Sequence, residues 1–148
     1  MTLRRSPLAP LAIAPLAVAA LASCGSNGVA PDLRSVTGMY DLEEVNAARL
    51  PTQVATSFTQ GTVRSGGMAC DRDIHCQIDI VIDSAGQRRT YRLAGYFVPR
   101  TQGELTFHEK GGRPVFEATW DGGSMIRTQS YLEMAMAFRW TGPFRFAA

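Results

Sequence analysis

A chain of 148 residues, 45% hydrophobic and 19% charged, is long enough to bury one core and too short for two domains. The formal net charge is +2, but Arg4 and Arg5 account for this excess, and residues 24–148 carry 13 basic and 13 acidic side chains. This balance excludes the basic surface of a nucleic-acid-binding protein. We therefore expect no nucleic acid among the partners of this protein.

The first 23 residues have the order of an export signal. Arg4 and Arg5 form a positive start, an apolar stretch runs from Pro7 to Ala22, and small residues precede Cys24. The apolar stretch is shorter than the ~20 residues that a membrane-spanning helix requires. We predict that residues 1–23 form a signal peptide.

The segment Leu21-Ala22-Ser23-Cys24 resembles the lipobox of bacterial lipoprotein signal peptides. The resemblance implies cleavage before Cys24 and acylation of this cysteine with palmitate-type chains, which would hold the protein in a membrane. With Gly25 after the cysteine, it also implies an outer-membrane lipoprotein that faces the periplasm. A plain secretory signal with an incidental cysteine is the alternative.

Three segments follow the signal. Residues 24–35 are rich in Gly, Ser and Asn, which predicts a flexible tether between the lipid and the fold. Residues 36–140 form the predicted β-domain, and residues 141–148 form a C-terminal tail.

From Gly38 onward the hydrophobic pattern has a period of two residues, which predicts β-strands. The clearest strand alternates five apolar residues with mostly polar ones; the apolar set is Ile74, Cys76, Ile78, Ile80 and Ile82. An earlier strand begins at Tyr40, and another runs from Gly61 to Cys70.

The later strands are separated by turns rich in Gly, Asp and Pro. Further strands are expected at 88–98, 105–107, 115–120, 125–128 and 134–140. Gly95 is expected to mark a bend or bulge. In the last strand, Met134, Met136, Phe138 and Trp140 alternate with small or charged residues.

These strands predict an all-β fold in one domain. Seven or eight short strands with tight turns are typical of a sandwich or a barrel. Sequential hairpins without a long crossover favour an antiparallel up-and-down meander barrel.

The opening Gly38-Met39-Tyr40-Asp41-Leu42, with Val45-Asn46 and Leu50-Pro51 after it, is similar to small bacterial lipocalin-like, calycin-type lipoproteins. The similarity includes segments 95–98, 105–107 and 136–139. It implies an eight-stranded barrel with an apolar cavity. Large inward side chains would line this cavity or fill the interior: Tyr40, Leu42, Ile78, Ile80, Tyr91, Phe107, Met136 and Phe138.

Two cysteines remain once the lipid accounts for Cys24. Export leads to an oxidising compartment, so we predict a disulfide between Cys70 and Cys76. The alternative is a metal site formed by both thiols with His75 and His108, but this spacing matches no zinc pattern. We predict no metal ion and no cofactor.

Two further side-chain sets have a structural explanation and a functional one. Met134 and Met136 could bind Cu(I), but their alternation with Phe138 favours the core. The acidic residues that could perform acid–base chemistry fall on polar strand faces or in turns, which favours surface positions; they are Glu43, Glu44, Asp79, Asp83 and Glu109. No nucleophile elbow or phosphate-binding loop is found, so we predict no catalytic residue and no enzymatic activity.

The sequence leaves three function classes. The first is a lipid-anchored, non-catalytic module that binds a small apolar ligand or an envelope partner. The second is a structural or stress-related envelope lipoprotein with a filled core. The third is a periplasmic hydrolase inhibitor, for which the tip between Cys70 and Cys76 is the only distinctive loop.

Overall fold

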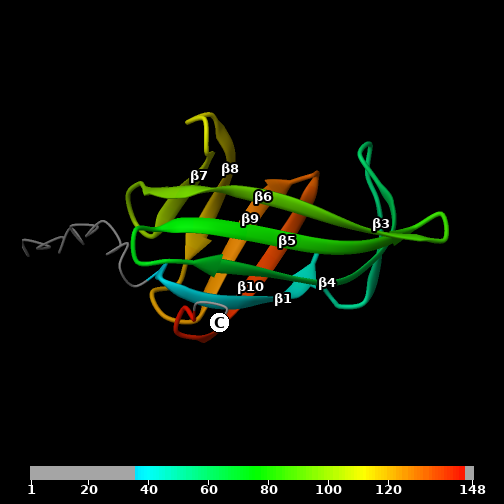
Figure 1. Cartoon of the computed structure of the whole chain (residues 1–148), viewed down its shortest axis with the longest axis horizontal. Helices are drawn as coiled ribbons and strands as arrows, with labels where there is room; N and C mark the ends of the chain where they lie inside the picture. Colours follow the sequence, from blue (N-terminus) through cyan, green and yellow to red (C-terminus); the bar gives the residue numbers. More distant parts are fainter. Residues whose placement is uncertain (1–35, 146–148) are drawn as a thin grey trace, which may run out of the picture.

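The computed structural model describes residues 36–145, so the predicted signal peptide, Cys24 and the tether lie outside the described residues. Ten strands make up this part of the chain (Figure 1). Their bounds are β1 (Gly38–Val45), β2 (Ala48–Arg49), β3 (Thr52–Ala55), β4 (Gln60–Cys70), β5 (His75–Ser84), β6 (Gln87–Pro99), β7 (Glu104–Glu109), β8 (Pro114–Trp120), β9 (Met125–Tyr131) and β10 (Met134–Gly142).

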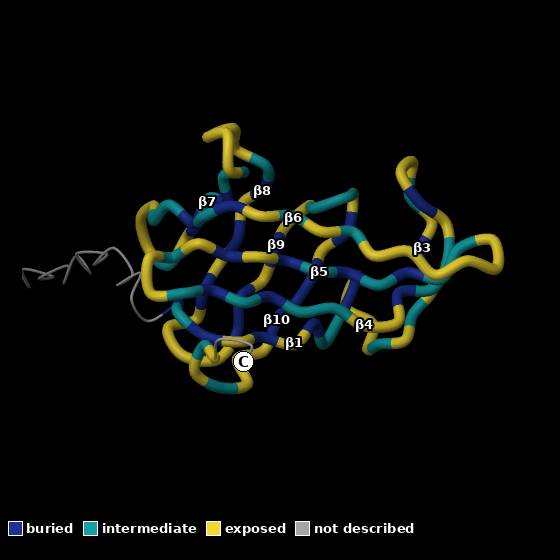
Figure 2. Tube along the Cα trace, in the orientation of Figure 1, coloured by how far each residue is buried: buried dark blue, intermediate teal, exposed yellow. Residues whose placement is uncertain are grey.

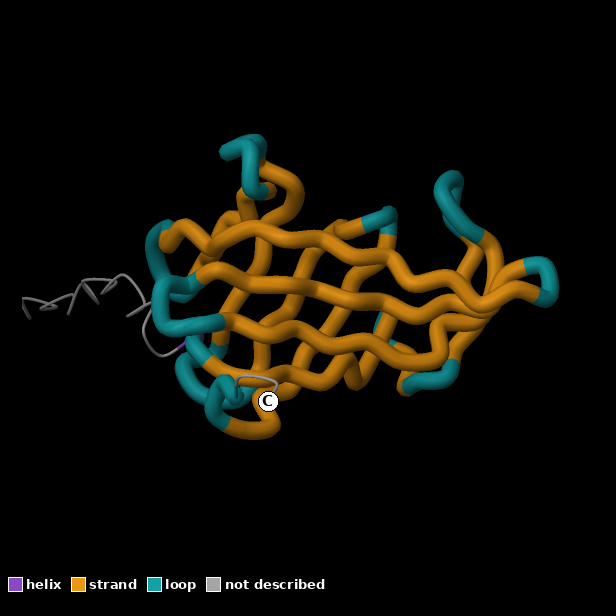
Figure 3. The backbone as a smooth tube through the Cα atoms, in the orientation of Figure 1, coloured by secondary structure: helices purple, strands orange, loops and turns teal. Residues whose placement is uncertain are grey.

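Eight of these strands close into one antiparallel barrel. From β4 to β10 each strand pairs with the next, and β1 pairs with both β10 and β4, which closes the wall. The short strands β2 and β3 extend β1 and β4 at their far ends. In Figures 1 and 3, β4, β5 and β6 run side by side across one wall. The predicted all-β, up-and-down barrel in one domain is confirmed.

Residues 36–145 include no helix with the length and apolar character needed to span a membrane.

Alternation along β5 places one face of the strand in the core. Cys76, Ile78, Ile80 and Ile82 are buried, while the residues between them are exposed or half-buried, a pattern visible along the tube in Figure 2. Antiparallel strands with one face against the core alternate in this way because successive side chains point to opposite faces.

The predicted inward residues all contribute to the barrel interior. Tyr91 is half-buried and packs against the core, and the other seven are buried: Tyr40, Leu42, Ile78, Ile80, Phe107, Met136 and Phe138. That they line a ligand cavity stays a prediction. Met134 and Met136 are buried as well, as expected for core side chains.

Aromatic rings occupy one end of the interior. Phe97 and Phe107 meet edge to face at 5.0 Å between ring centroids, and Phe107 stacks on Phe116 at 4.9 Å. Tyr131 lies 5.3 Å from Phe116. Such pairs contribute about 0.5–1.5 kcal/mol each beyond the burial of their area.

The strand prediction was wrong at Ile74. This residue lies in the β4–β5 turn with φ of 60°, and β5 begins only at His75. The cause is Asp71, whose side-chain oxygen accepts hydrogen bonds from the backbone N–H groups of Asp73 and His75 and so holds the turn.

Two further positions differ from the simple strand pattern, one in the last strand and one in β6. Trp140 is 40% exposed; its indole lies over Gly38, where a Cβ would collide with the ring, and its Nε1 donates to the carbonyl of Thr37 at 3.4 Å. Gly95 forms no bulge, since the register of β6 with β5 and β7 runs through it without a shift. Glycine is needed there because a Cβ would lie 2.0 Å from the carbonyl oxygen of His108.

Candidate functional site: a groove on the outer barrel wall

The strand register aligns a row of outward side chains, two of which are alanines, across four strands. Met39 on β1 pairs with Ala69 on β4, Ala69 with Gln77 on β5, and Gln77 with Ala94 on β6. The next outward position along β4 is Gly67, which pairs with Asp41 and Asp79. Since alanine and glycine fill little of the outer surface, the wall is hollow along this row.

This hollow is a groove with a volume of about 780 Å³. Ala69, Ala94 and Gly95 contribute to its floor, and the larger side chains of Met39, Tyr96 and Phe144 border it. Phe144 and Arg145 come from the segment after β10, so residues from the end of the described chain help to enclose the groove. A smaller hollow of about 310 Å³ shares Met39 and Ala69 with it and continues over Gly67.

Charged side chains stand at the border of this apolar groove. Lys110 reaches it from the β7–β8 turn, where its backbone N–H donates to the carbonyl of Ala94 at 3.2 Å. Arg145 adds a second cation, and Asp71 and His75 come from the β4–β5 turn. An apolar groove with two cations at its border suits an amphiphilic molecule with an acidic group.

The β4–β5 turn beside the groove is closed by the predicted disulfide. Cys70 and Cys76 are cross-strand partners with Cα atoms 4.1 Å apart, and their sulfur atoms are bonded. The disulfide prediction is therefore confirmed. It also removes both thiols from the alternative metal set, because neither sulfur is free as a thiolate ligand.

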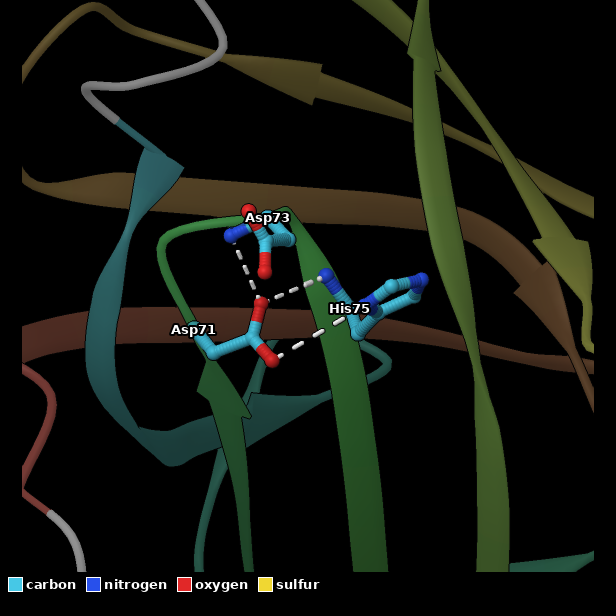
Figure 4. Close-up of side chains that lie close together, drawn as sticks. All are labelled: Asp71, Asp73 and His75. Atoms are coloured by element: carbon cyan, nitrogen blue, oxygen red, sulfur yellow. Dashed lines mark hydrogen bonds and ion pairs between the residues drawn. The ribbon is translucent and has the colours of Figure 1, made fainter.

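Asp71, Asp73 and His75 gather at the tip of this turn (Figure 4), with potential ligand atoms within 4.8 Å of one another. One oxygen of Asp71 accepts from the backbone N–H groups of Asp73 and His75 at 2.9 and 3.0 Å. Its other oxygen lies 3.8 Å from Nδ1 of His75. The arrangement is that of a carboxylate that stabilises its own turn.

The five acidic candidates from the sequence do not converge on one site. Each lies within 4.0 Å of an arginine on the protein surface; the pairs are Glu43–Arg139, Glu44–Arg127, Asp79–Arg92, Asp83–Arg64 and Arg88, and Glu109–Arg113. Hydrogen bonds from Arg88 and Arg64 lower the pKa of Asp83 to about 2. A hydrogen bond from Arg139 likewise lowers the pKa of Glu43. Carboxylates held in the ionised form in this way accept hydrogen bonds and do not donate protons at neutral pH.

Sequence reasoning missed the groove because its signal lies on the outward face. In the segment Ser65-Gly66-Gly67-Met68-Ala69, the small residues Ser65, Gly67 and Ala69 occupy outward positions. Gly66 and Met68 between them pair with the buried residues Ile80 and Ile78 and occupy inward positions. Reading every second residue of a predicted strand for small size would have indicated a hollow on one face.

Compared with protein-family models, with curated proteins and with solved structures, the chain matches none of them.

Proposed function

We propose that this chain is a lipid-anchored protein of the bacterial envelope whose lipocalin-like barrel binds an apolar small molecule with an acidic group in the outer groove. The observation that carries this proposal is the groove of about 780 Å³, with its apolar floor and the cations Lys110 and Arg145 at its border. Ligand pockets typically measure about 300–1,000 Å³ and combine apolar lining with a few polar groups that orient the ligand.

The packed barrel interior supports a site on the outside. Large side chains with less than 2% exposure occupy the centre of the barrel, including Tyr40, Phe97, Phe107 and Phe138. An eight-stranded barrel is only wide enough to be filled by side chains or to hold one small ligand. A ligand inside would have to displace these rings, whereas the outer groove is already open.

The predicted anchor would keep the groove near a source of amphiphilic molecules. Thr37, at the start of the described chain, donates from its hydroxyl to the carbonyl of Asp71 at 3.2 Å, so the tether would enter beside the groove. The predicted tether comprises the twelve residues 24–35. Fully extended, they reach about 40 Å, which keeps the groove within this distance of the membrane surface.

A fluorescent fatty acid tests the proposal with the mature chain, residues 24–148, carrying Cys24→Ser so that no lipid is attached. We expect saturable binding to this protein. Ala69→Trp and Ala94→Trp fill the groove and should weaken binding at least tenfold. Ala135→Trp is the matched control, since Ala135 is exposed on β10 and does not line the groove.

The acidic group is tested separately with Lys110→Glu. This variant should weaken binding of the fatty acid and leave binding of the corresponding fatty alcohol unchanged, because only the acid is repelled by the new carboxylate. Saturable binding that survives both tryptophan substitutions would place the ligand elsewhere and overturn the proposal.

A further inference from the structure

Strand β6 pairs with β5 along one edge and with β7 along the other, and it is longer than β7. β6 runs from Gln87 to Pro99, and its pairing with β5 extends from Gln87 to Tyr96. Its pairing with β7 covers only Gly95 to Pro99. Within residues 36–145, residues 87–94 therefore have a strand on one side and none on the other. We call this stretch the open edge of β6.

The backbone groups that point away from β5 can be assigned from one hydrogen bond. The carbonyl of Ala94 accepts from the backbone N–H of Lys110 at 3.2 Å, so the backbone groups of Ala94 face the β7 side. The β5–β6 register has no shift, and backbone groups alternate between the two sides of an antiparallel strand. The N–H and C=O groups of Arg88, Thr90 and Arg92 therefore point outward along the open edge.

The side chains beside this edge give it an apolar inner face. Tyr91 and Leu93 pair with the buried residues Ile80 and Ile78, so they point to the interior, but both remain half-buried. Tyr131 and Leu132, from the β9–β10 hairpin, are likewise only partly buried against the core. An added strand could cover apolar surface that the short β7–β8 hairpin leaves accessible.

The charge of the open edge favours one kind of partner. Residues 87–94 include three arginines and no acidic residue. Arg88 and Arg92 pair with Asp83 and Asp79 on the outer face, whereas Arg89 has no ion pair among the described residues. Two copies paired edge to edge would bring their arginines together, a known protection of edge strands against self-association. An acidic segment would complement Arg89, whose charge has no partner among the described residues.

We propose that the open edge of β6 binds an extended acidic segment of a partner protein as an added strand. The backbone of this segment would bond to the groups of Arg88, Thr90 and Arg92. Its alternate side chains would provide apolar contacts to Tyr91 and Leu93 and a carboxylate to Arg89. This mode of recognition takes its affinity from main-chain hydrogen bonds and its specificity from alternate side chains. The open edge and the ligand groove share Ala94, but the backbone groups of Arg88, Thr90 and Arg92 belong to the edge alone, since none of these residues lines the groove.

The test uses the full mature chain and a nine-residue peptide, followed by amide hydrogen exchange. Every second residue of the peptide faces inward: valine opposite Tyr91 and Leu93 and glutamate opposite Arg89, which share one face of β6, with threonine at the positions between. In the free protein, the amides of Arg88, Thr90 and Arg92 should exchange quickly, and those of Arg89 and Tyr91, which face β5, should be protected. With the peptide bound, the first three amides should become at least tenfold more protected.

Substitution of Thr90 provides the matched pair of variants. Thr90→Pro removes an N–H that bonds to no other strand, so the barrel should stay folded by circular dichroism while peptide affinity falls at least tenfold. Thr90→Val keeps the N–H and should bind as the original does. Arg89→Glu should weaken the acidic peptide and favour one with lysine in place of glutamate.

Three results would overturn the proposal: unchanged peptide affinity in a folded Thr90→Pro protein, equal affinity for the acidic and the lysine peptides, or no gain in protection at the three amides. Concentration-dependent dimerisation that protects the same amides without peptide would show that a second copy is the occupant, and would also refute it.

Discussion

On β5, two neighbouring residues have opposite roles. Ile80 is fully buried in the barrel core, whereas Asp79 lies on the outer face and pairs with Arg92 at 2.9 Å. The side chain of Arg92 in that pair is 64% exposed, so water screens the attraction. Ile80 therefore contributes more to the free energy of unfolding than the ion pair of Asp79 does.

Ile80→Ala should lower the free energy of unfolding by about 2–5 kcal/mol, as large-to-small changes in packed cores do. Asp79→Ala should lower it by no more than about 1 kcal/mol, the range for exposed ion pairs. Urea unfolding of the two variants measures the difference. Equal losses would contradict the assignment of Ile80 to the inner face of β5 and Asp79 to the outer face.

Tyr40 joins the start of the described chain to the core. Its buried hydroxyl donates to the carbonyl of Val36 at 2.7 Å, and burial, reinforced by the charge of Asp121, raises its pKa to about 12. In the unfolded chain a tyrosine loses its proton near pH 10. Between these two values the unfolded state is deprotonated and the folded state is not, so stability falls as the pH rises.

We therefore expect the melting temperature to decline from about pH 10 upward, with a shallower decline in Tyr40→Phe. Burial also raises the pKa of Tyr131, so absorbance at 295 nm should show late-titrating tyrosines in the folded protein, and the late amplitude should be smaller in Tyr40→Phe. A parallel decline in both proteins would mean that other groups determine the alkaline limit.

At the scale of elements, the hairpin of β4 and β5 joins the disulfide, the Asp71 turn and one border of the groove. Covalent closure restricts the unfolded chain, but only over a separation of six residues, so its effect is small. Its position matters more, because the loop it closes carries Asp71 and His75 to the groove.

Replacing Cys70 and Cys76 together with serine should lower the free energy of unfolding by about 2 kcal/mol, with the barrel retained. Denaturant unfolding measures this loss. Alkylation of the original protein without reductant should label neither cysteine, and labelling of both would contradict the bond.

Sequence patterns predicted the strands better than their ends. The alternation from Cys76 to Ile82 was sufficient to predict β5, because a half-buried strand produces this pattern directly. Ile74 continued the same pattern but fell in the turn, since one carboxylate side chain ended the alternation there. Trp140 continued another such pattern, but its side chain is 40% exposed and its indole packs over Gly38, about a hundred residues earlier. Contacts this distant leave no trace in a local period.

For the whole molecule, barrel closure was predictable and the groove was not. The meander follows from hairpins between sequence neighbours, which short turns impose. The groove depends on the register that aligns Met39, Ala69 and Ala94 across four strands, and a shift by one residue would turn each of them inward.

The proposed attachment to the membrane depends on Cys24, which lies outside the described residues. We expect mass spectrometry of the mature protein to find an acylated cysteine at its N-terminus and Cys24→Ser to release the protein from membranes. An unmodified terminus, or cleavage at another position, would refute the lipoprotein assignment. Recovery with the inner membrane would refute only the outer-membrane location.

The pairing of β1 with β10 also determines how the barrel is expected to assemble. Met39 and Gly142 are partners, and the hydroxyl of Thr141 donates to the carbonyl of Met39 at 3.1 Å. Every ladder from β4 to β10 can form as a local hairpin, whereas this one must bring together chain segments about a hundred residues apart. Loop-closure entropy makes such a contact late. Until it forms, β1 and β10 both remain open edges, so this final ladder determines how long the nascent protein is vulnerable to aggregation.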